Sequence, residues 1–163
     1  FLKLELEAIE NGDEIQIIAL ETTYERTLTD ARLPFPILIK GNVDRIELRN
    51  GTIRIVDYKT GKVEQRNVTL KDWHGLTEDI KNEKIIQVLA YAFMFENEAQ
   101  GRDMEAGIIS FKNLKSGFLP FQFKQDKDVT AVISTAIMEN YLEQLVVLLQ
   151  EILDVSIPFQ EKM

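Results

Sequence analysis

The sequence predicts a mixed α/β fold in which a β-sheet is covered by helices. Segments with strand-like apolar patterns and segments with apolar residues at helical spacing occur in the order strands, helix, two strands, helix. The chain has 163 residues, of which 45% are hydrophobic, and this is enough for one hydrophobic core. No Gly-, Ser- or Pro-rich linker divides it, so we expect a single domain over residues 1–163.

The N-terminal half is expected to consist mainly of strands. Two runs rich in Ile, Val and Leu flank the dipeptide Asn50-Gly51. This dipeptide is typical of a two-residue hairpin turn, because both turn residues must adopt positive φ angles. The elements expected here are a strand or helix end over residues 1–10, a strand over 14–29, hairpin strands over 36–48 and 52–59, and a loop over 61–75.

The C-terminal half is expected to contain two helices that flank a second hairpin. Apolar residues recur every three or four positions in two segments, which is the pattern of a helix with one buried face. The elements expected here are a helix from Thr77 or Asn82 to about Glu98, strands over 106–111 and 117–123, and a long helix capped by Asp126 or Asp128 that ends near Asp154.

The predicted hairpin brings two acidic residues together. With a turn at Asn50-Gly51, the numbers of paired residues sum to 101, so Asp44 lies directly opposite Asp57. Side chains alternate between the two faces of a strand, which places Lys59 on the same face as both aspartates. Like charges that face each other destabilise a sheet, so this pair requires a reason.

A divalent cation supplies that reason. Carboxylate oxygens at this spacing suit magnesium or manganese, and the backbone carbonyl of Tyr58 is a possible third ligand. Such an ion activates water and polarises a phosphate, while Lys59 is placed to orient the water or to stabilise negative charge. The alternative is that Asp44 and Asp57 simply lie at the solvated edge of the sheet and that Lys59 forms an ordinary ion pair with them.

Three motifs resemble those of a known family. They are Gly41-Asn42-Val43-Asp44-Arg45-Ile46, Ile55-Val56-Asp57-Tyr58-Lys59-Thr60-Gly61, and Gln87 and Tyr91 four residues apart on a predicted helix. Together they resemble the PD-(D/E)XK nuclease superfamily and, more narrowly, its RecB/AddB-type exonuclease domains.

The resemblance implies a restriction-endonuclease-like core, with a mixed sheet flanked by helices. It also implies that Asp44 and Asp57 bind Mg²⁺, for which Mn²⁺ is able to substitute, and that Lys59 is catalytic. By the same resemblance, Gln87 and Tyr91 organise the site and the DNA backbone; without it, they are better explained as a buried hydrogen-bonding pair.

The implied function is that of a metal-dependent DNA exonuclease domain in a helicase–nuclease for recombination and repair. Its partners would be DNA and the helicase domains or subunit of the same complex. Because the first residue is not Met, we expect the chain to be a fragment of a larger protein. Two family features are missing: a further ligand before Asp44, where Glu21 is the only acidic residue worth considering, and cysteines for an iron–sulfur cluster.

Composition limits the remaining possibilities. The chain has no cysteine, no secretory signal and no apolar run of membrane-spanning length, and we expect a cytoplasmic protein without membrane contacts. Its net charge of −8 disfavours binding of nucleic acid through a broad basic surface. Two other hypotheses therefore stay open: a catalytically inactive nuclease-like module that binds DNA or acts as a scaffold, and a protein-binding domain with an incidental acid pair.

Overall fold

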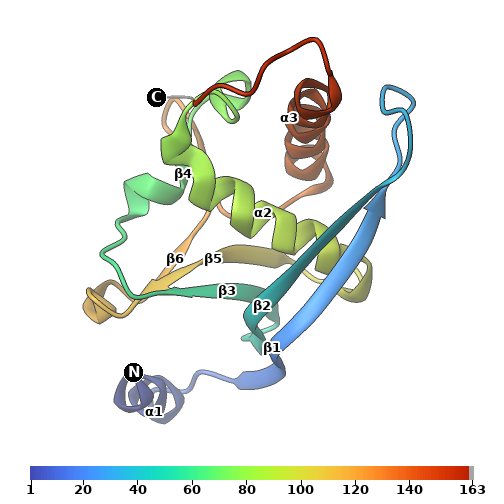
Figure 1. The fold of residues 1–163 in the computed structure, drawn as a ribbon. Helices are drawn as coiled ribbons and strands as arrows, with labels where there is room; N and C mark the ends of the chain where they lie inside the picture. The colour runs from blue at the N-terminus through green and yellow to red at the C-terminus, as the bar shows by residue number, and fades with distance from the viewer. Residues whose placement is uncertain (162–163) are drawn as a thin grey trace.

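The computed structural model describes residues 1–161 and has the predicted mixed α/β architecture (Figure 1). A five-stranded sheet has the order β1-β2-β3-β5-β6, in which β3 and β5 are parallel and the other neighbours are antiparallel. Its strands are β1 (Ile15–Leu28), β2 (Ile37–Arg49), β3 (Thr52–Lys59), β5 (Met104–Ser110) and β6 (Phe118–Pro120).

Helices lie on both faces of this sheet. A parallel strand pair needs a crossover connection, and α2 provides it between β3 and β5. Figure 1 shows α2 and α3 on one face and α1 on the other. The helices are α1 (Leu2–Glu10), α2 (Glu83–Phe95) and α3 (Thr135–Leu153), and short 3₁₀ turns are η1 (Gln65–Val68), η2 (Trp73–Gly75), η3 (Ile80–Asn82), η4 (Glu96–Glu98) and η5 (Leu114–Ser116).

The segment 61–75 is more ordered than the predicted polar loop. It contains η1, η2 and a short strand, β4 (Thr69–Leu70), which joins a second sheet of order β4-β7-β8. Val68 and Leu70 are buried in the same core as the main sheet, so the few apolar residues of this segment anchor it. The other strands of the second sheet are β7 (Gln122–Gln125) and β8 (Asp128–Thr130).

The predicted start of the last helix is wrong. Asp126 has a φ of 54° and lies in the tight turn between β7 and β8, where Val129 pairs with Lys124. The helix begins later, at Thr135, and its cap is Ser134, whose Oγ accepts a hydrogen bond from the Ile137 N–H at 3.2 Å. Val129 fits the helical spacing of the residues that follow, but strand pairing determines its conformation.

The core fills the space between the main sheet and the two C-terminal helices. Fully buried residues of β2 and β3 face α2, whose apolar residues include the buried run Phe93–Phe95. Tyr141 of α3 donates a hydrogen bond from its hydroxyl to the Ile86 carbonyl at 3.1 Å and so joins the two helices. Within residues 1–161, no helix has the length and apolar character needed to cross a membrane.

Candidate active site

The turn at Asn50-Gly51 forms as predicted and sets the predicted register. Asn50 and Gly51 have φ angles of 51° and 85°, and the strand pairs run from Arg49 with Thr52 to Arg45 with Val56. Asp44 and Asp57 occupy the next position of this register, but the ladder of paired residues ends before it.

The two strands separate at these aspartates. Beyond this point β2 stays paired only with β1, while β3 continues along β5, and Figure 1 shows β1 and β2 leaving the rest of the sheet as a two-stranded arm. The Asp44 carboxylate takes the place of the missing backbone partner, because its Oδ2 accepts a hydrogen bond from the Tyr58 N–H at 2.7 Å. The acid pair therefore lies where the sheet opens.

The backbone of Tyr58 also faces this opening. In an extended strand the N–H and the C=O of one residue point to the same side, and the Tyr58 N–H points toward Asp44. The carbonyl of the next residue, Lys59, points the other way and accepts a hydrogen bond from the Phe111 N–H at 2.9 Å. The Tyr58 carbonyl oxygen is thus directed toward the Asp44 side of β3, as a third oxygen ligand would be.

A continuous series of polar contacts leads from Asp57 to α2. Lys59 Nζ lies 2.9 Å from Asp57 Oδ2 and donates a hydrogen bond to Gln87 Oε1 at 2.8 Å. Gln87 Nε2 in turn donates to the Tyr91 hydroxyl at 2.8 Å. The spacing of four residues places Gln87 and Tyr91 on one helical face, and that face lies against the end of β3. The structure therefore brings Asp57, Lys59, Gln87 and Tyr91 together, with Asp44 adjacent.

Asp57 is buried and incompletely satisfied. Only 4% of the residue is exposed, and burial, together with the negative charge of Asp44, raises the pKa of its carboxyl group above the usual 3.8. The contact with Lys59 lowers that pKa but does not cancel the effect. Within the described chain, Asp57 Oδ2 has no hydrogen-bond donor in good geometry, so the Lys59 contact is an ion pair alone. A buried carboxylate oxygen with spare capacity fits a bound cation.

Gly41 allows Tyr91 to approach β2 closely. A Cβ atom on Gly41 would lie 3.1 Å from Tyr91 Cε1 and 3.3 Å from Met94 Cε, closer than most such contacts. Burial raises the pKa of the Tyr91 hydroxyl, and the charges of Asp57 and Asp44 add to this effect. Tyr91 is therefore a neutral phenol that holds Gln87 in place.

Two carboxylates, those of Asp44 and Asp57, lie at this opening. Among residues 1–161, no three Asp, Glu, His or Cys side chains converge as a metal-binding group. Glu21, the acidic residue considered upstream, is exposed on β1 and has a φ of 45°. Asp44, Asp57 and the Tyr58 carbonyl are thus the available oxygen ligands, and substrate or water would have to complete the coordination.

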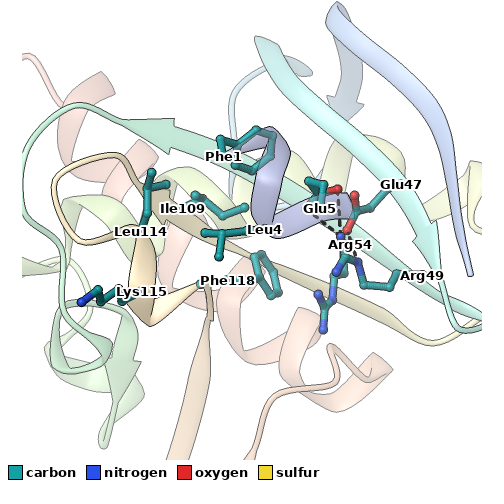
Figure 2. Close-up of a pocket in the computed structure, with 11 residues that line it drawn as sticks. Phe1, Leu4, Glu5, Glu47, Arg49, Arg54, Ile109, Leu114, Lys115 and Phe118 are labelled. Carbon is teal, nitrogen blue, oxygen red and sulfur yellow. Dashed lines mark hydrogen bonds and ion pairs between the residues drawn. The ribbon is translucent and has the colours of Figure 1, made fainter. Parts of the chain in front are cut away.

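A cavity of about 220 Å³ lies on the opposite face of the sheet, beneath α1 (Figure 2). Its acidic residues are already engaged: Glu47 contacts Arg49 at 2.9 Å, and Glu5 contacts the same arginine at 2.9 Å. Figure 2 shows Glu5 and Glu47 turned toward Arg49 and not toward a free space. These carboxylates hold α1 on the sheet, and we do not assign the active site to this cavity.

Sequence reasoning missed one residue near the site. Lys84 lies in the first turn of α2, and its positive charge lowers the pKa of Asp57. Its position three residues before Gln87 places it on the same helical face, and this spacing is the signal that would have identified it.

A comparison with protein families identifies the family of this fold. The family model described as the PD-(D/E)XK nuclease superfamily matches residues 2–162. The chain belongs to this superfamily. Membership in the PD-(D/E)XK superfamily suggests a nuclease, which is a hydrolase, and the mixed sheet flanked by helices is consistent with its restriction-endonuclease-like fold.

Other comparisons are less informative. No functionally curated protein matches the chain. A solved structure described as "Crystal structure of SSO0001" is similar at 18% identity and a TM-score of 0.32, covering 90% of this chain and 57% of that one. The chain thus spans little more than half the length of that protein, and we draw no argument from the likeness.

Proposed function

We propose that this chain is a metal-dependent DNA exonuclease domain of the RecB/AddB type. In this proposal it is the nuclease part of a cytoplasmic helicase–nuclease that acts in recombination and repair, and its partners are DNA and helicase domains. The observation that supports it best is the series of contacts from Asp57 through Lys59 and Gln87 to Tyr91, beside Asp44. Asp57 adds to this support, because its buried Oδ2 is ion-paired with Lys59 but accepts no hydrogen bond in good geometry.

The reaction would be hydrolysis of a phosphodiester bond. A water oxygen forms a bond to phosphorus and gives up a proton to solvent, while the bond from phosphorus to the 3′ oxygen breaks and that oxygen takes up a proton from solvent to become a hydroxyl. Lys59 is placed to stabilise the negative charge that develops on the phosphate, since its ammonium group is fixed before substrate binds. Gln87 and Tyr91 act as positioning residues for Lys59.

The superfamily implies a divalent metal, and the residues at the opening fit one. Asp44, Asp57 and the Tyr58 carbonyl would hold it, with Mg²⁺ as the expected ion and Mn²⁺ as a substitute. When bound, such an ion lowers the pKa of water and polarises the phosphate. Manganese binding should broaden the NMR signals of Asp44 and Asp57 before those of other acidic residues, and this readout does not depend on activity.

The test is cleavage of end-labelled DNA by the full-length protein with magnesium, with and without EDTA. Asp57→Asn and Lys59→Met should each reduce the rate by about 10²–10³-fold, the usual loss when a charge-stabilising group is removed from an active site. The matched control is Asp128→Asn, an exposed aspartate on β8. Equal rates for the wild type, Asp57→Asn and Asp128→Asn would contradict the catalytic assignment.

A second candidate is a nuclease-like module that binds DNA or acts as a scaffold without cutting it. Two observations favour it: within residues 1–161 the site offers two converging carboxylates and no third, and the chain carries a net charge of −8. The intact positions of Lys59, Gln87 and Tyr91 favour the enzyme, because a module without catalysis has little use for a fixed lysine. DNA binding without cleavage by the full-length protein in any divalent metal would support this module.

A further inference from the structure

A cavity of about 510 Å³ opens beside Lys59. One wall is the segment 59–63, which begins at the last residue of β3, and the other is the first turn of α2 with Gln87. Each wall contributes a lysine in addition to Lys59: Lys62 from the segment after β3 and Lys84 from α2. Three lysines and one acidic residue, Glu83, thus line one cavity in a chain whose net charge is −8.

Lys84 is available for a ligand. Its ion pair is with the neighbouring Glu83 at 3.2 Å, and the Glu83 side chain is 65% exposed. An exposed pair of this kind contributes about 0–1 kcal/mol, so a phosphate displaces it readily. The charge of Lys84 also acts on Asp57, so the lysine lies near the reacting groups as well as in the cavity.

Lys62 is available for a similar reason and lies on a fixed backbone. Its partner Glu64 lies 3.3 Å away but also pairs with Arg66 at 2.6 Å, so Glu64 keeps a partner when Lys62 leaves. The residues on either side of Lys62 are held in place. Ser110 Oγ donates a hydrogen bond to the Gly61 carbonyl at 2.7 Å, and Asn113 Nδ2 donates one to the Val63 carbonyl at 2.7 Å.

We propose that Lys62 and Lys84 bind the phosphodiester adjacent to the one that is cleaved. This inference rests on the proposed function and names the strand-binding residues of that same site. A volume of about 510 Å³ is typical of pockets that hold a drug-sized ligand, so it accommodates a short strand segment. Clustered cations focus the attraction for a polyanion at this cavity.

The experiment measures binding separately from cleavage. A fluorescent single-stranded oligo(dT) is titrated with full-length protein carrying Asp57→Asn, in EDTA, and anisotropy gives the Kd over a range of salt concentrations. Lys62→Gln/Lys84→Gln is compared with the matched control Lys124→Gln/Lys127→Gln, two exposed lysines on and after β7. Thermal melts verify that all variants are folded.

The Lys62/Lys84 double variant should weaken binding about tenfold. It should also reduce the slope of log Kd against log salt by about 0.7, since the two lysines share one phosphate and each phosphate contact to a single strand contributes about 0.7. The Lys124/Lys127 variant should change neither quantity. Equal Kd values and slopes for the two double variants, or no strand binding by the parent protein, would overturn the inference.

The two proposals fail in different ways. If the wild type cleaves DNA but the Lys62/Lys84 variant keeps the parent's salt slope, the nuclease assignment stands and the strand-binding assignment is wrong. If the wild type does not cleave but the slope falls as expected, the lysines bind the strand and the enzymatic proposal is wrong.

Discussion

The residue at position 87 has to supply two different kinds of hydrogen bond. Its oxygen accepts from Lys59 at 2.8 Å, and its nitrogen donates to the Tyr91 hydroxyl at 2.8 Å. Of the common side chains of this length, glutamine offers both an acceptor and a donor, whereas a carboxylate would only accept. The amide therefore couples the position of a cation on β3 to a phenol one turn further along α2.

At the same scale, the buried carboxyl group of Asp57 should lower the stability of the metal-free protein at neutral pH. Because burial raises its pKa in the folded state, the native protein holds the proton more tightly than the unfolded chain does. Stability is therefore highest below the ordinary pKa of aspartate and falls as the pH rises through the raised value.

Asp57→Asn removes this titration. The variant should be more stable than the wild type at pH 7 in EDTA, and the difference should disappear below about pH 4, where aspartate is protonated in both states. Each 1 kcal/mol gained should raise Tm by about 2–4 °C in thermal melts. Asp128→Asn, which alters an exposed aspartate, should show no gain. A lower Tm for Asp57→Asn at pH 7 would show that the Lys59 ion pair outweighs the cost of burial.

At the scale of elements, α1 is attached to the sheet by charges. None of its residues is buried. Glu5 contacts Arg45 at 2.8 Å and Arg49 at 2.9 Å, the latter drawn in Figure 2. Glu47 of β2, whose side chain is 3% exposed, contacts the same two arginines. Four charged side chains thus occupy the side of β2 opposite the acid pair. The charge of each one is neutralised by the opposite charges of its neighbours.

Removing one charge from this group should be costly. Glu47→Gln removes a buried negative charge and leaves the positive charges of Arg45 and Arg49 only partly neutralised. The free energy of unfolding should therefore fall by about 3 kcal/mol. Urea denaturation gives this value. Glu25→Gln is the matched control, because Glu25 pairs with Lys40 at 3.7 Å on the surface, and the expected loss is below about 1 kcal/mol. Similar losses for both variants would mean that α1 does not depend on the buried group.

At the scale of the whole molecule, the two sheets share one core, and we predict a single cooperative unfolding transition. Leu70 and Phe121 are buried in the same cluster as Ile55 of the main sheet. The single tryptophan, Trp73, stacks on Phe123 of the second sheet at a ring distance of 5.3 Å. Trp73 therefore reports on the second sheet, while far-UV circular dichroism reports on the whole chain.

In urea, the fluorescence and circular dichroism midpoints should coincide. Leu70→Ala should lower the free energy of unfolding by about 2–5 kcal/mol, because it leaves a cavity in the shared core. Both midpoints should therefore shift together to lower urea concentration. The substitution of Lys127 by Gln, at an exposed site, should leave both midpoints unchanged. Two separated midpoints would contradict a single domain.

The parts that could be predicted from the sequence are those that local chemistry determines. The Asn50-Gly51 turn fixed the pairing of β2 with β3, and the four-residue spacing placed Gln87 and Tyr91 on one face. The separation of β2 from β3 could not be predicted, because it depends on β1 and β5, which pair from opposite sides.

The other errors also have physical reasons. In β7 and β8 the strands are too short to show an alternating pattern, and the apolar residue Val129 fits helical spacing equally well. The α1 attachment joins Glu5 to residues about 40 positions later, and charged residues at such separation carry no periodic signal. Lys84 is one lysine among many polar residues, and only its place on α2 distinguishes it.

The hairpin also limits how this protein can change in length over evolution. The turn at Asn50-Gly51 sets the register of the strands between Asp44 and Asp57. Adjacent side chains in a strand point to opposite sides of the sheet. An insertion or deletion of one residue between Asp44 and the turn would carry that carboxylate across to the α1 side, away from Lys59. Descendants that keep the site should therefore vary at the distal loop of the β1–β2 arm and conserve the length of this short hairpin.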